Sequence, residues 1–272
     1  MLHVFDAVCN LINADGDILS LVISAVGNGP FSAVVDGIGF GKQLSAEDKV
    51  SFSAEFLQIG DVRLRFAQSE LWDAKPDWEA LNGKNELLLR ACAYITTLLA
   101  SDAPPGSFTE LALPIQRKFA PDDAIFRKAE VAIKGMIAGL SMRDFMTMRI
   151  NTRALAGLGS GLTPAGDDFL VGAMHALWAC LPREEAQRIS HLIREEASPR
   201  TNSLSAAWLR AAAKGQAGEM WHRLLNAIAG FDEARMSEAV ARILPTGHTS
   251  GADALGAFVA TVQALDKRSE GR

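Results

Sequence analysis

Hydrophobic and polar positions change their spacing about a quarter of the way along the chain. Up to about residue 75, short apolar segments alternate with turn residues, and residues 51–56 alternate polar with apolar side chains, which is typical of a half-buried strand. The pair Asp15-Gly16 predicts a hairpin turn. The expected strands span residues 3–12, 18–24, 31–35, 49–57 and 62–66. Several short strands in so few residues predict a small antiparallel barrel or sandwich.

Beyond this point the apolar residues recur at helical spacing to the end of the chain. Alanine is abundant here, and it favours helices that pack closely. The expected helices span residues 85–99, 121–137, 141–156, 164–180, 183–197, 204–213, 217–229, 232–244 and 250–265. The sequence therefore predicts an α+β protein, with a small antiparallel β-rich domain over residues 1–75 and a larger, mostly α-helical domain over residues 76–272.

Composition narrows the choice of partner and compartment. The net charge of −5 argues against nucleic acid and anionic membranes as partners, because neither attracts an acidic surface. The longest apolar stretches, 91–100 and 169–181, are shorter than the roughly 20 residues needed to cross a bilayer, and no secretory signal is expected. Three scattered cysteines suit a reducing compartment, so we expect a cytoplasmic protein. The chain carries no signature for a nucleotide, haem, zinc or flavin.

The segment 157–168 has the composition of an anion-binding loop. Its glycines free the backbone, while Thr163 is a natural helix cap and Pro164 an ideal first helical residue. A glycine loop that leads into a helix presents unpaired N–H groups to an anion. Asp167 and Asp168 would repel that anion unless Mg²⁺ bridges them to it, or unless one of them binds a substrate amide. A capped helix with two dipole-favouring carboxylates is the alternative interpretation. The expected anion contacts here are Gly159, Ser160, Gly161 and Thr163.

A second segment, 247–253, repeats the first in outline. Thr249 corresponds to Thr163, and Asp253 corresponds to Asp167, because each aspartate lies four residues beyond its threonine. We expect the two helix amino termini to converge on one pocket, with His248 transferring a proton near neutral pH. A capping box at the start of the second helix is the alternative. The expected anion contacts are Thr249, Ser250 and Gly251.

A third polar cluster, at residues 200–203, precedes another expected helix. Thr201 and Ser203 could contact substrate, and a helix cap would explain the cluster as well.

The stretches 159–168 and 247–253 resemble the two signature motifs of a bacterial domain-of-unknown-function family that includes the AllH subunit of oxamate carbamoyltransferase, from anaerobic allantoin degradation, a branch of purine catabolism. The resemblance extends over most of the chain, including its β-rich start. Ser160 stands where the family usually has proline, which would make this loop less rigid.

The resemblance implies a part in converting oxalurate and phosphate to oxamate and carbamoyl phosphate, together with two other subunits. All four molecules are anions, which suits a site at two helix amino termini. Two functions stay open. The chain is either a carbamoyltransferase subunit with catalytic Asp167, Asp168, His248 and Asp253 and a Mg²⁺ held by the first two, or a non-catalytic, metabolite-binding or regulatory subunit.

Overall fold

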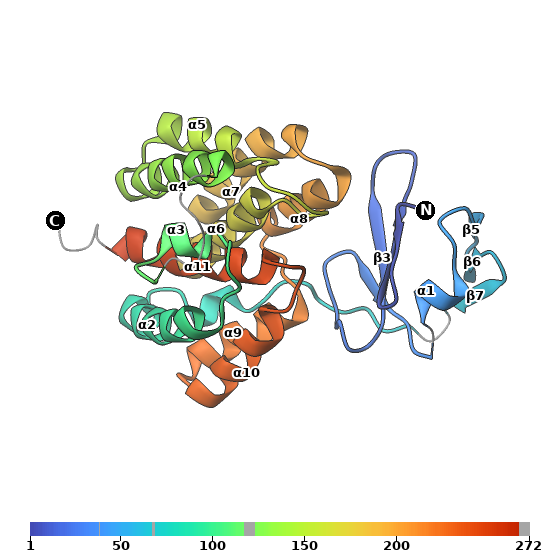
Figure 1. Cartoon of the computed structure of the whole chain (residues 1–272). Coiled ribbons are helices and arrows are strands. Elements are labelled where there is room, and N and C mark those ends of the chain that lie inside the picture. Colours follow the sequence, from blue (N-terminus) through green and yellow to red (C-terminus); the bar gives the residue numbers. More distant parts are fainter. Residues whose placement is uncertain (38, 67–68, 117–122, 267–272) are drawn as a thin grey trace. The chain divides into compact units, whose positions relative to one another are not determined.

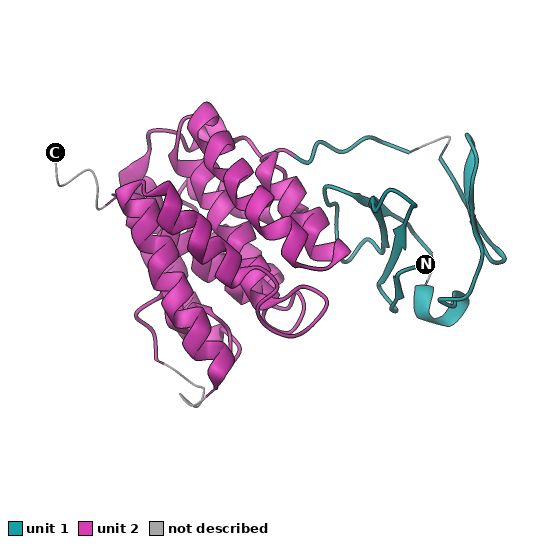
Figure 2. Cartoon of the chain, turned by 90° about the horizontal axis from the view of Figure 1, so that it is seen from above, with its two compact units in different colours: residues 1–74 teal, residues 75–272 magenta. Residues whose placement is uncertain are grey.

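The computed structural model describes residues 1–37, 39–66, 69–116 and 123–266. The chain divides into two compact units, Met1–Ala74 and Lys75–Arg272 (Figure 2). The first unit contains short strands and the second is built from helices, so the predicted α+β class with a small β-rich start is confirmed.

The first sheet of the β-rich unit is mixed rather than purely antiparallel. Its strands follow the order β1-β2-β3-β4, with β3 and β4 parallel and the other neighbours antiparallel. Gly16 adopts a φ of 82° in the predicted turn between β2 and β3. The strands are β1 (His3–Val4), β2 (Val8–Ile12), β3 (Ile18–Val22) and β4 (Ser32–Val34).

The second sheet is antiparallel and contains one strand more than the sequence predicted. The expected strand 49–57 is two paired strands, because the Ser53 hydroxyl accepts hydrogen bonds from the backbone N–H groups of Glu55 and Phe56 and closes a turn between them. Its strands are β5 (Val50–Phe52), β6 (Phe56–Ile59) and β7 (Val62–Arg65). A short helix, α1 (Phe40–Gln43), occupies a stretch expected to be a turn and contributes the fully buried Phe40 to the core of this unit.

The helical unit contains every helix expected from the sequence, and residues 121–122 of the second one lie outside the described residues. The short elements η1, α3 and η2 were not expected. No described helix is long and apolar enough to cross a membrane. The elements are η1 (Trp78–Ala80), α2 (Asn85–Asp102), α3 (Thr109–Ala112), α4 (Ala124–Met142), α5 (Phe145–Leu155), α6 (Ala165–Cys180), α7 (Arg183–Ala197), η2 (Ser198–Arg200), α8 (Ser203–Ala213), α9 (Glu219–Ala229), α10 (Glu233–Ile243) and α11 (Ser250–Asp266).

Helices α6 and α11 lie side by side at the centre of this unit (Figure 1). Both are buried along nearly their whole length, as expected of helices that are apolar all round. Their backbones approach so closely at one point that a Cβ atom added to Gly172 would lie 1.9 Å from the carbonyl oxygen of Ala254. This packing brings the amino termini of the two central helices together.

Candidate functional site

The two motif loops meet at the amino termini of α6 and α11. The hydroxyl oxygens of Thr163, just before α6, and of Ser250, the first residue of α11, are 2.9 Å apart. The two helix starts therefore converge as predicted, while a shared pocket between them stays a prediction. The two motifs meet through a hydrogen bond to which each contributes one hydroxyl group.

The two helix starts are also equivalent in detail. A Cβ atom added to Gly166 would lie 2.0 Å from the carbonyl oxygen of Leu155, the last residue of α5. One added to Gly251 would lie 2.0 Å from that of Ile243, the last residue of α10. Each glycine thus lets its helix start against the end of the preceding helix, where no side chain would fit.

This equivalence corrects the alignment of the two motifs. Counting from the paired glycines, Asp168 corresponds to Asp253, because each follows its glycine by two positions. The expected match of Asp253 with Asp167 was wrong by one residue. The loop before α6 spans residues 156–164 and the loop before α11 only residues 244–249, so counting from the threonines misplaces the register.

Asp168 and Asp253 lie in the first turns of α6 and α11, close enough for the charge of Asp168 to raise the pKa of Asp253. Asp168 is half-buried and Asp253 is completely buried. In each, Oδ2 is inaccessible to solvent and makes no hydrogen bond to another described residue. The Oδ1 of Asp253 accepts a hydrogen bond of 2.5 Å from the backbone N–H of Phe108, just before α3. We call these two residues the carboxyl pair.

Burial shifts both members of the carboxyl pair toward their protonated forms. It raises the pKa of Asp168 to about 7, and the negative charge of Asp167 acts in the same direction, while the hydroxyls of Ser250 and Thr163 oppose the shift. Burial also raises the pKa of Asp253 well above its usual value, and the charge of Asp168 adds to this effect. Two carboxylates in one poorly solvated place do not both ionise readily, so the pair holds at least one proton near neutral pH.

Asp167 has a different role from its neighbour. It is buried, and its Oδ1 accepts a hydrogen bond of 2.9 Å from the backbone N–H of Gly157, while its Oδ2 accepts one from the Thr201 hydroxyl. Burial raises its pKa, and these two hydrogen bonds counteract part of the shift. Consecutive residues do not share a helix face, so Asp167 and Asp168 meet different partners. Asp167 ties the start of the glycine loop to the segment that precedes α8.

The donor set does not fit the expected Mg²⁺ at Asp167 and Asp168. Both oxygens of Asp167 are already hydrogen-bonded within the chain, which leaves Asp168 as the one member of the expected Mg²⁺ pair with an oxygen that lacks a hydrogen-bond partner among the described residues. Within the described ranges, no group of three or more His, Cys, Asp or Glu residues could hold a metal ion. A Mg²⁺ at this place stays a prediction without support from the geometry.

One backbone N–H group at the start of each helix is engaged within the chain, and one of the two, that of Gly251, belongs to an expected anion contact. The backbone N–H of Gly166 donates to the carbonyl oxygen of Leu158 over 2.9 Å, and that of Gly251 donates to Thr246 over 3.1 Å. The middle of the first loop remains open: Ser160 and Gly161 are exposed, and Gly159 is half-buried with a φ of 115°. Anion binding by the glycine loop therefore stays a prediction that rests on this outer part.

The remaining residues that were predicted to contact substrate differ in how far they are exposed to solvent. His248 is exposed in the turn before α11, and Thr249, beside it, is half-buried. Ser203 is exposed at the start of α8, where the Asn202 side chain caps the helix by accepting a hydrogen bond from the backbone N–H of Ser205. The helix-cap alternative thus accounts for part of the third cluster, while Thr201 serves Asp167. A substrate contact from His248, Thr249 or Ser203 stays a prediction.

Two contacts at this site were not expected from the sequence, although Asn202 belongs to the predicted polar cluster at residues 200–203. Phe108, whose N–H holds Asp253, lies in a stretch without an expected element, after Pro104-Pro105-Gly106. Asn202 donates to the carbonyl oxygen of Leu162 over 2.8 Å and so holds the outer part of the glycine loop. Nothing in a single sequence indicates either contact, since both join segments that are far apart along the chain.

Comparison with known proteins matches both units to one family. Residues 155–262, which include both motifs, match the family model described as oxamate carbamoyltransferase subunit AllH. Residues 3–71 match the model of the AllH family N-terminal domain. No match to this chain was found among solved structures.

Proposed function

Since the chain belongs to the AllH family, we propose that it is a subunit of an oxamate carbamoyltransferase and that its carboxyl pair donates a proton during carbamoyl transfer. The reaction would convert oxalurate and phosphate to oxamate and carbamoyl phosphate. One observation carries the catalytic part of the proposal: Asp168, whose pKa is raised to about 7, and the buried Asp253, whose pKa the charge of Asp168 raises, lie in the first turns of the two helices whose starts meet through Thr163 and Ser250.

The chemistry of this transfer needs an acid. An oxygen of phosphate forms a bond to the carbamoyl carbon, and the bond from that carbon to the nitrogen of the oxamate group breaks. The electron pair of the broken bond goes to this nitrogen, which must gain a proton to leave as a neutral amide. A carboxyl group that is still protonated near neutral pH can supply that proton, and its pKa lies close to the most effective value for the task.

The groups around the carboxyl pair have supporting roles in this proposal. The hydroxyls of Thr163 and Ser250 lie over the pair and orient the substrate amide. The outer glycine loop, with Gly159, Ser160 and Gly161, contacts an anionic group of the substrate, together with the exposed His248. Asp167 acts as a positioning residue, because it holds Gly157 and thereby fixes where this loop begins.

The family model describes a subunit, so other subunits of a multi-subunit enzyme are the expected partners. We propose a cytoplasmic location, since Cys9, Cys92 and Cys180 are free thiols, as is usual in a reducing compartment.

The proposal is tested by the pH dependence of oxalurate phosphorolysis in the enzyme assembled with its partner subunits. With Asp168 as the acid, kcat should fall above about pH 7 as this group loses its proton. Asp168→Asn should lower kcat by about 100-fold or more while leaving KM nearly unchanged. Asp102→Asn, on the exposed end of α2, is the matched control. An unchanged kcat in Asp168→Asn would show that this subunit is not the proton donor and would favour the metabolite-binding or regulatory alternative.

A further inference from the structure

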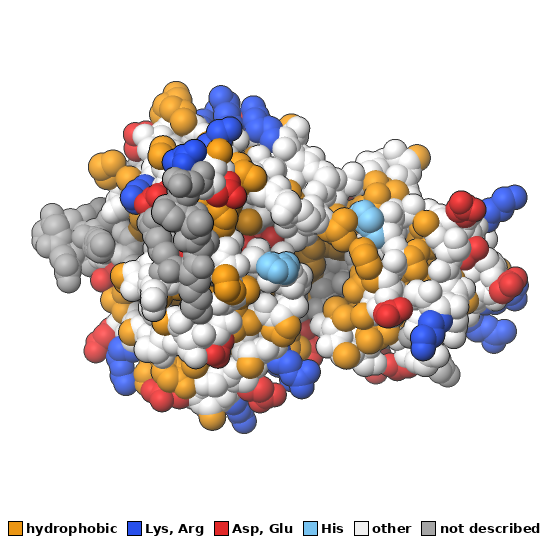
Figure 3. Space-filling model, viewed as in Figure 1, with side chains coloured by type: hydrophobic (Ala, Val, Ile, Leu, Met, Phe, Trp, Pro, Cys, Tyr) orange, Lys and Arg blue, Asp and Glu red, His pale blue; other side chains and the backbone are white. Residues whose placement is uncertain are grey.

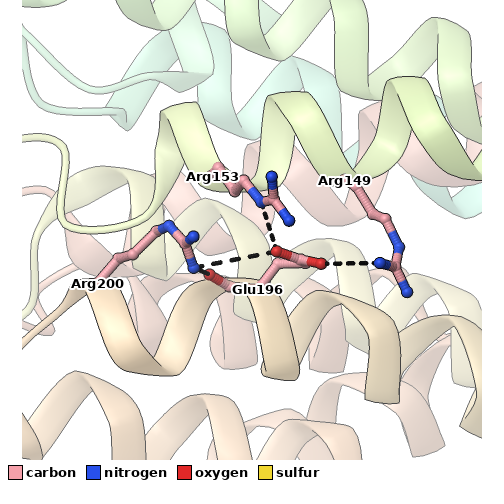
Figure 4. A network of polar contacts seen from close by, with 4 residues as sticks. All are labelled: Arg149, Arg153, Glu196 and Arg200. Atoms are coloured by element: carbon pink, nitrogen blue, oxygen red, sulfur yellow. Dashed lines mark hydrogen bonds and ion pairs between the residues drawn. The ribbon is translucent and has the colours of Figure 1, made fainter.

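Three arginines, two from α5 and one from η2, surround Glu196 of α7 in the helical unit (Figure 4). Arg153 Nε lies 2.5 Å from Glu196 Oε2, and Arg149 Nη1 lies 3.3 Å from Oε1. Arg200 Nη1 lies 4.0 Å from Oε2 and donates a hydrogen bond of 2.6 Å to the backbone carbonyl of Glu196. We call Arg149, Arg153 and Arg200 the arginine triad.

The arginine triad carries more positive charge than the chain neutralises there. Glu196 is 8% exposed, and its pKa is lowered chiefly by its hydrogen bond with Arg153, so it stays a carboxylate. One carboxylate against three guanidinium groups leaves a net charge of +2. Among the residues that the structure describes, Glu196 is the sole acidic partner of all three arginines.

The triad also keeps hydrogen-bond donors that Glu196 does not use. Arg153 contacts Glu196 through Nε, which leaves both of its terminal nitrogens available, and Arg149 and Arg200 each contact it through Nη1 alone. The side chains of Arg149, Arg153 and Arg200 are 46%, 49% and 41% exposed, so a solute can reach these donors. Guanidinium forks held in fixed positions match the oxygens of phosphate and carboxylate groups.

The surroundings of the triad are basic, although the whole chain is acidic. Residues 124–155, which span α4 and α5 and include Arg149 and Arg153 of the triad itself, contain six Lys and Arg against two Asp and Glu, while the chain carries −5. Figure 3 shows Lys and Arg side chains gathered over α4 and α5 at the upper edge of the helical unit. An anion that approaches this face is attracted rather than repelled.

The triad is built on the same scaffold as the candidate site. A Cβ atom added to Gly157 would lie 2.6 Å from the carbonyl oxygen of Arg200, so the glycine loop starts directly against this arginine. The next residue, Thr201, donates to Asp167. Arg153, in turn, lies in the last turn of α5, just before the glycine loop. A ligand held by the triad is therefore attached to the segments that set the position of the loop.

We propose that the arginine triad binds a small multivalent oxyanion of the phosphate class, with Glu196 holding the three guanidinium groups in place. The inference deepens the proposed function, on which it rests for the identity of the anion, because phosphate is the co-substrate there and the carboxyl pair offers it no positive charge. Binding to the triad needs neither turnover nor partner subunits, so it can be measured on the purified chain.

The test is calorimetric titration of inorganic phosphate into the full chain at low ionic strength, with Arg149→Gln as the main variant. Arg149 is chosen because Arg153 and Arg200 still hold Glu196 in its absence. Phosphate affinity should fall about tenfold or more in Arg149→Gln, and only partly recover in Arg149→Lys, which lacks the fork. Arg223→Gln, which breaks an exposed pair with Glu219 on α9, is the matched control and should bind phosphate like the wild type.

Two results would overturn the inference: equal phosphate affinity in the wild type and Arg149→Gln, or no measurable binding to the wild type. A lower melting temperature of Arg149→Gln with unchanged affinity would mean that the triad is a structural ion cluster only. Asp168→Asn should bind phosphate like the wild type. If Asp168→Asn loses turnover but still binds phosphate, the proton donor and the arginine triad are separate groups. Either proposal can therefore fail while the other stands.

Discussion

The hydroxyl oxygens of Thr163 and Ser250 lie 2.9 Å apart, although 87 positions separate the two residues in the sequence. This contact joins the starts of α6 and α11, whose first turns carry Asp168 and Asp253, and both hydroxyls lie close enough to Asp168 to lower its pKa. The two helices therefore contribute the same three features to one place: a glycine where the helix passes the end of its predecessor, a hydroxyl, and a carboxyl group in the first turn.

The first prediction concerns the dependence of stability on pH. The pKa of Asp168 in the folded chain, about 7, lies above its value of about 4 in an unfolded chain. Between about pH 4 and pH 7 the native state therefore binds more protons than the unfolded state. The free energy of unfolding that Asp168 contributes is complete below about pH 4 and is lost as the pH rises to 7. Asp168→Asn should therefore gain stability relative to the wild type over this range, by about 1.4 kcal/mol for each unit of pKa shift removed.

Urea unfolding at pH 5, 6, 7 and 8 measures this difference, with Asp102→Asn as the exposed control. A difference between Asp168→Asn and the wild type that stays constant over these pH values would contradict the prediction. The same variant should also lower the pKa of Asp253, because the charge of Asp168 helps to raise it, and carboxyl NMR titration would detect the change.

The second prediction concerns the glycines at the two helix starts. Gly166→Ala and Gly251→Ala should each destabilise the chain by about 1–3 kcal/mol, because the new methyl group would overlap a backbone carbonyl that cannot turn away. Gly230→Ala is the control: its Cβ would meet nothing closer than 3.8 Å, and its φ of −92° suits any residue. Thermal unfolding followed by circular dichroism checks the result, and similar melting temperatures for all three variants would be inconsistent with it.

The sequence patterns predicted where helices and strands occur better than they predicted how the strands pair. The helical spacing after residue 75 is a local feature, so the helices could be inferred from the sequence. The expected cap was wrong by one residue: Pro164 is the capping position, α6 begins at Ala165, and the Thr163 hydroxyl bonds to Ser250 instead of capping the helix. The direction of β4 could not, because alternating polar and apolar residues look the same in a parallel and an antiparallel strand. The sheet is mixed because β3 and β4 are parallel, which depends on the path of the segment between them. No local sequence pattern indicates that path.

The candidate site shows the same limit at the level of single residues. Counting from the threonines paired Asp253 with Asp167, whereas the structure pairs it with Asp168, because the two loops differ in length. The backbone N–H that holds Asp253 belongs to Phe108, just before α3, a helix without a sequence pattern of its own that packs on α11. The arginine triad comes from α5 and η2, and its partner Glu196 comes from α7. The charges could be counted from the sequence, but their proximity in the fold could not be predicted.

The third prediction concerns the anchor of the glycine loop. Thr201→Val keeps the shape of the side chain but removes the hydroxyl that donates to Asp167, so a buried carboxylate loses one of its hydrogen bonds. The expected cost is about 1–3 kcal/mol, together with a further rise in the pKa of Asp167, since that hydrogen bond lowers it. Hydrogen exchange of residues 157–163 should accelerate, while Thr201→Ser should behave like the wild type. Unchanged exchange in Thr201→Val would mean that Gly157 and Asp167 hold the loop without this hydroxyl.

The last prediction concerns Mg²⁺. Asp167 uses both oxygens for hydrogen bonds, and the carboxyl pair holds a proton near neutral pH, which competes with any cation for the same oxygens. Calorimetric titration of Mg²⁺ into the purified chain at pH 7 should therefore give the same weak heats for the wild type and Asp168→Asn. The titration is repeated at pH 8.5, where more of the pair is ionised, to give a metal site its best chance. Submillimolar Mg²⁺ binding by the wild type that disappears in Asp168→Asn would show instead that the pair accepts the metal, and the proton would then have to come from another group.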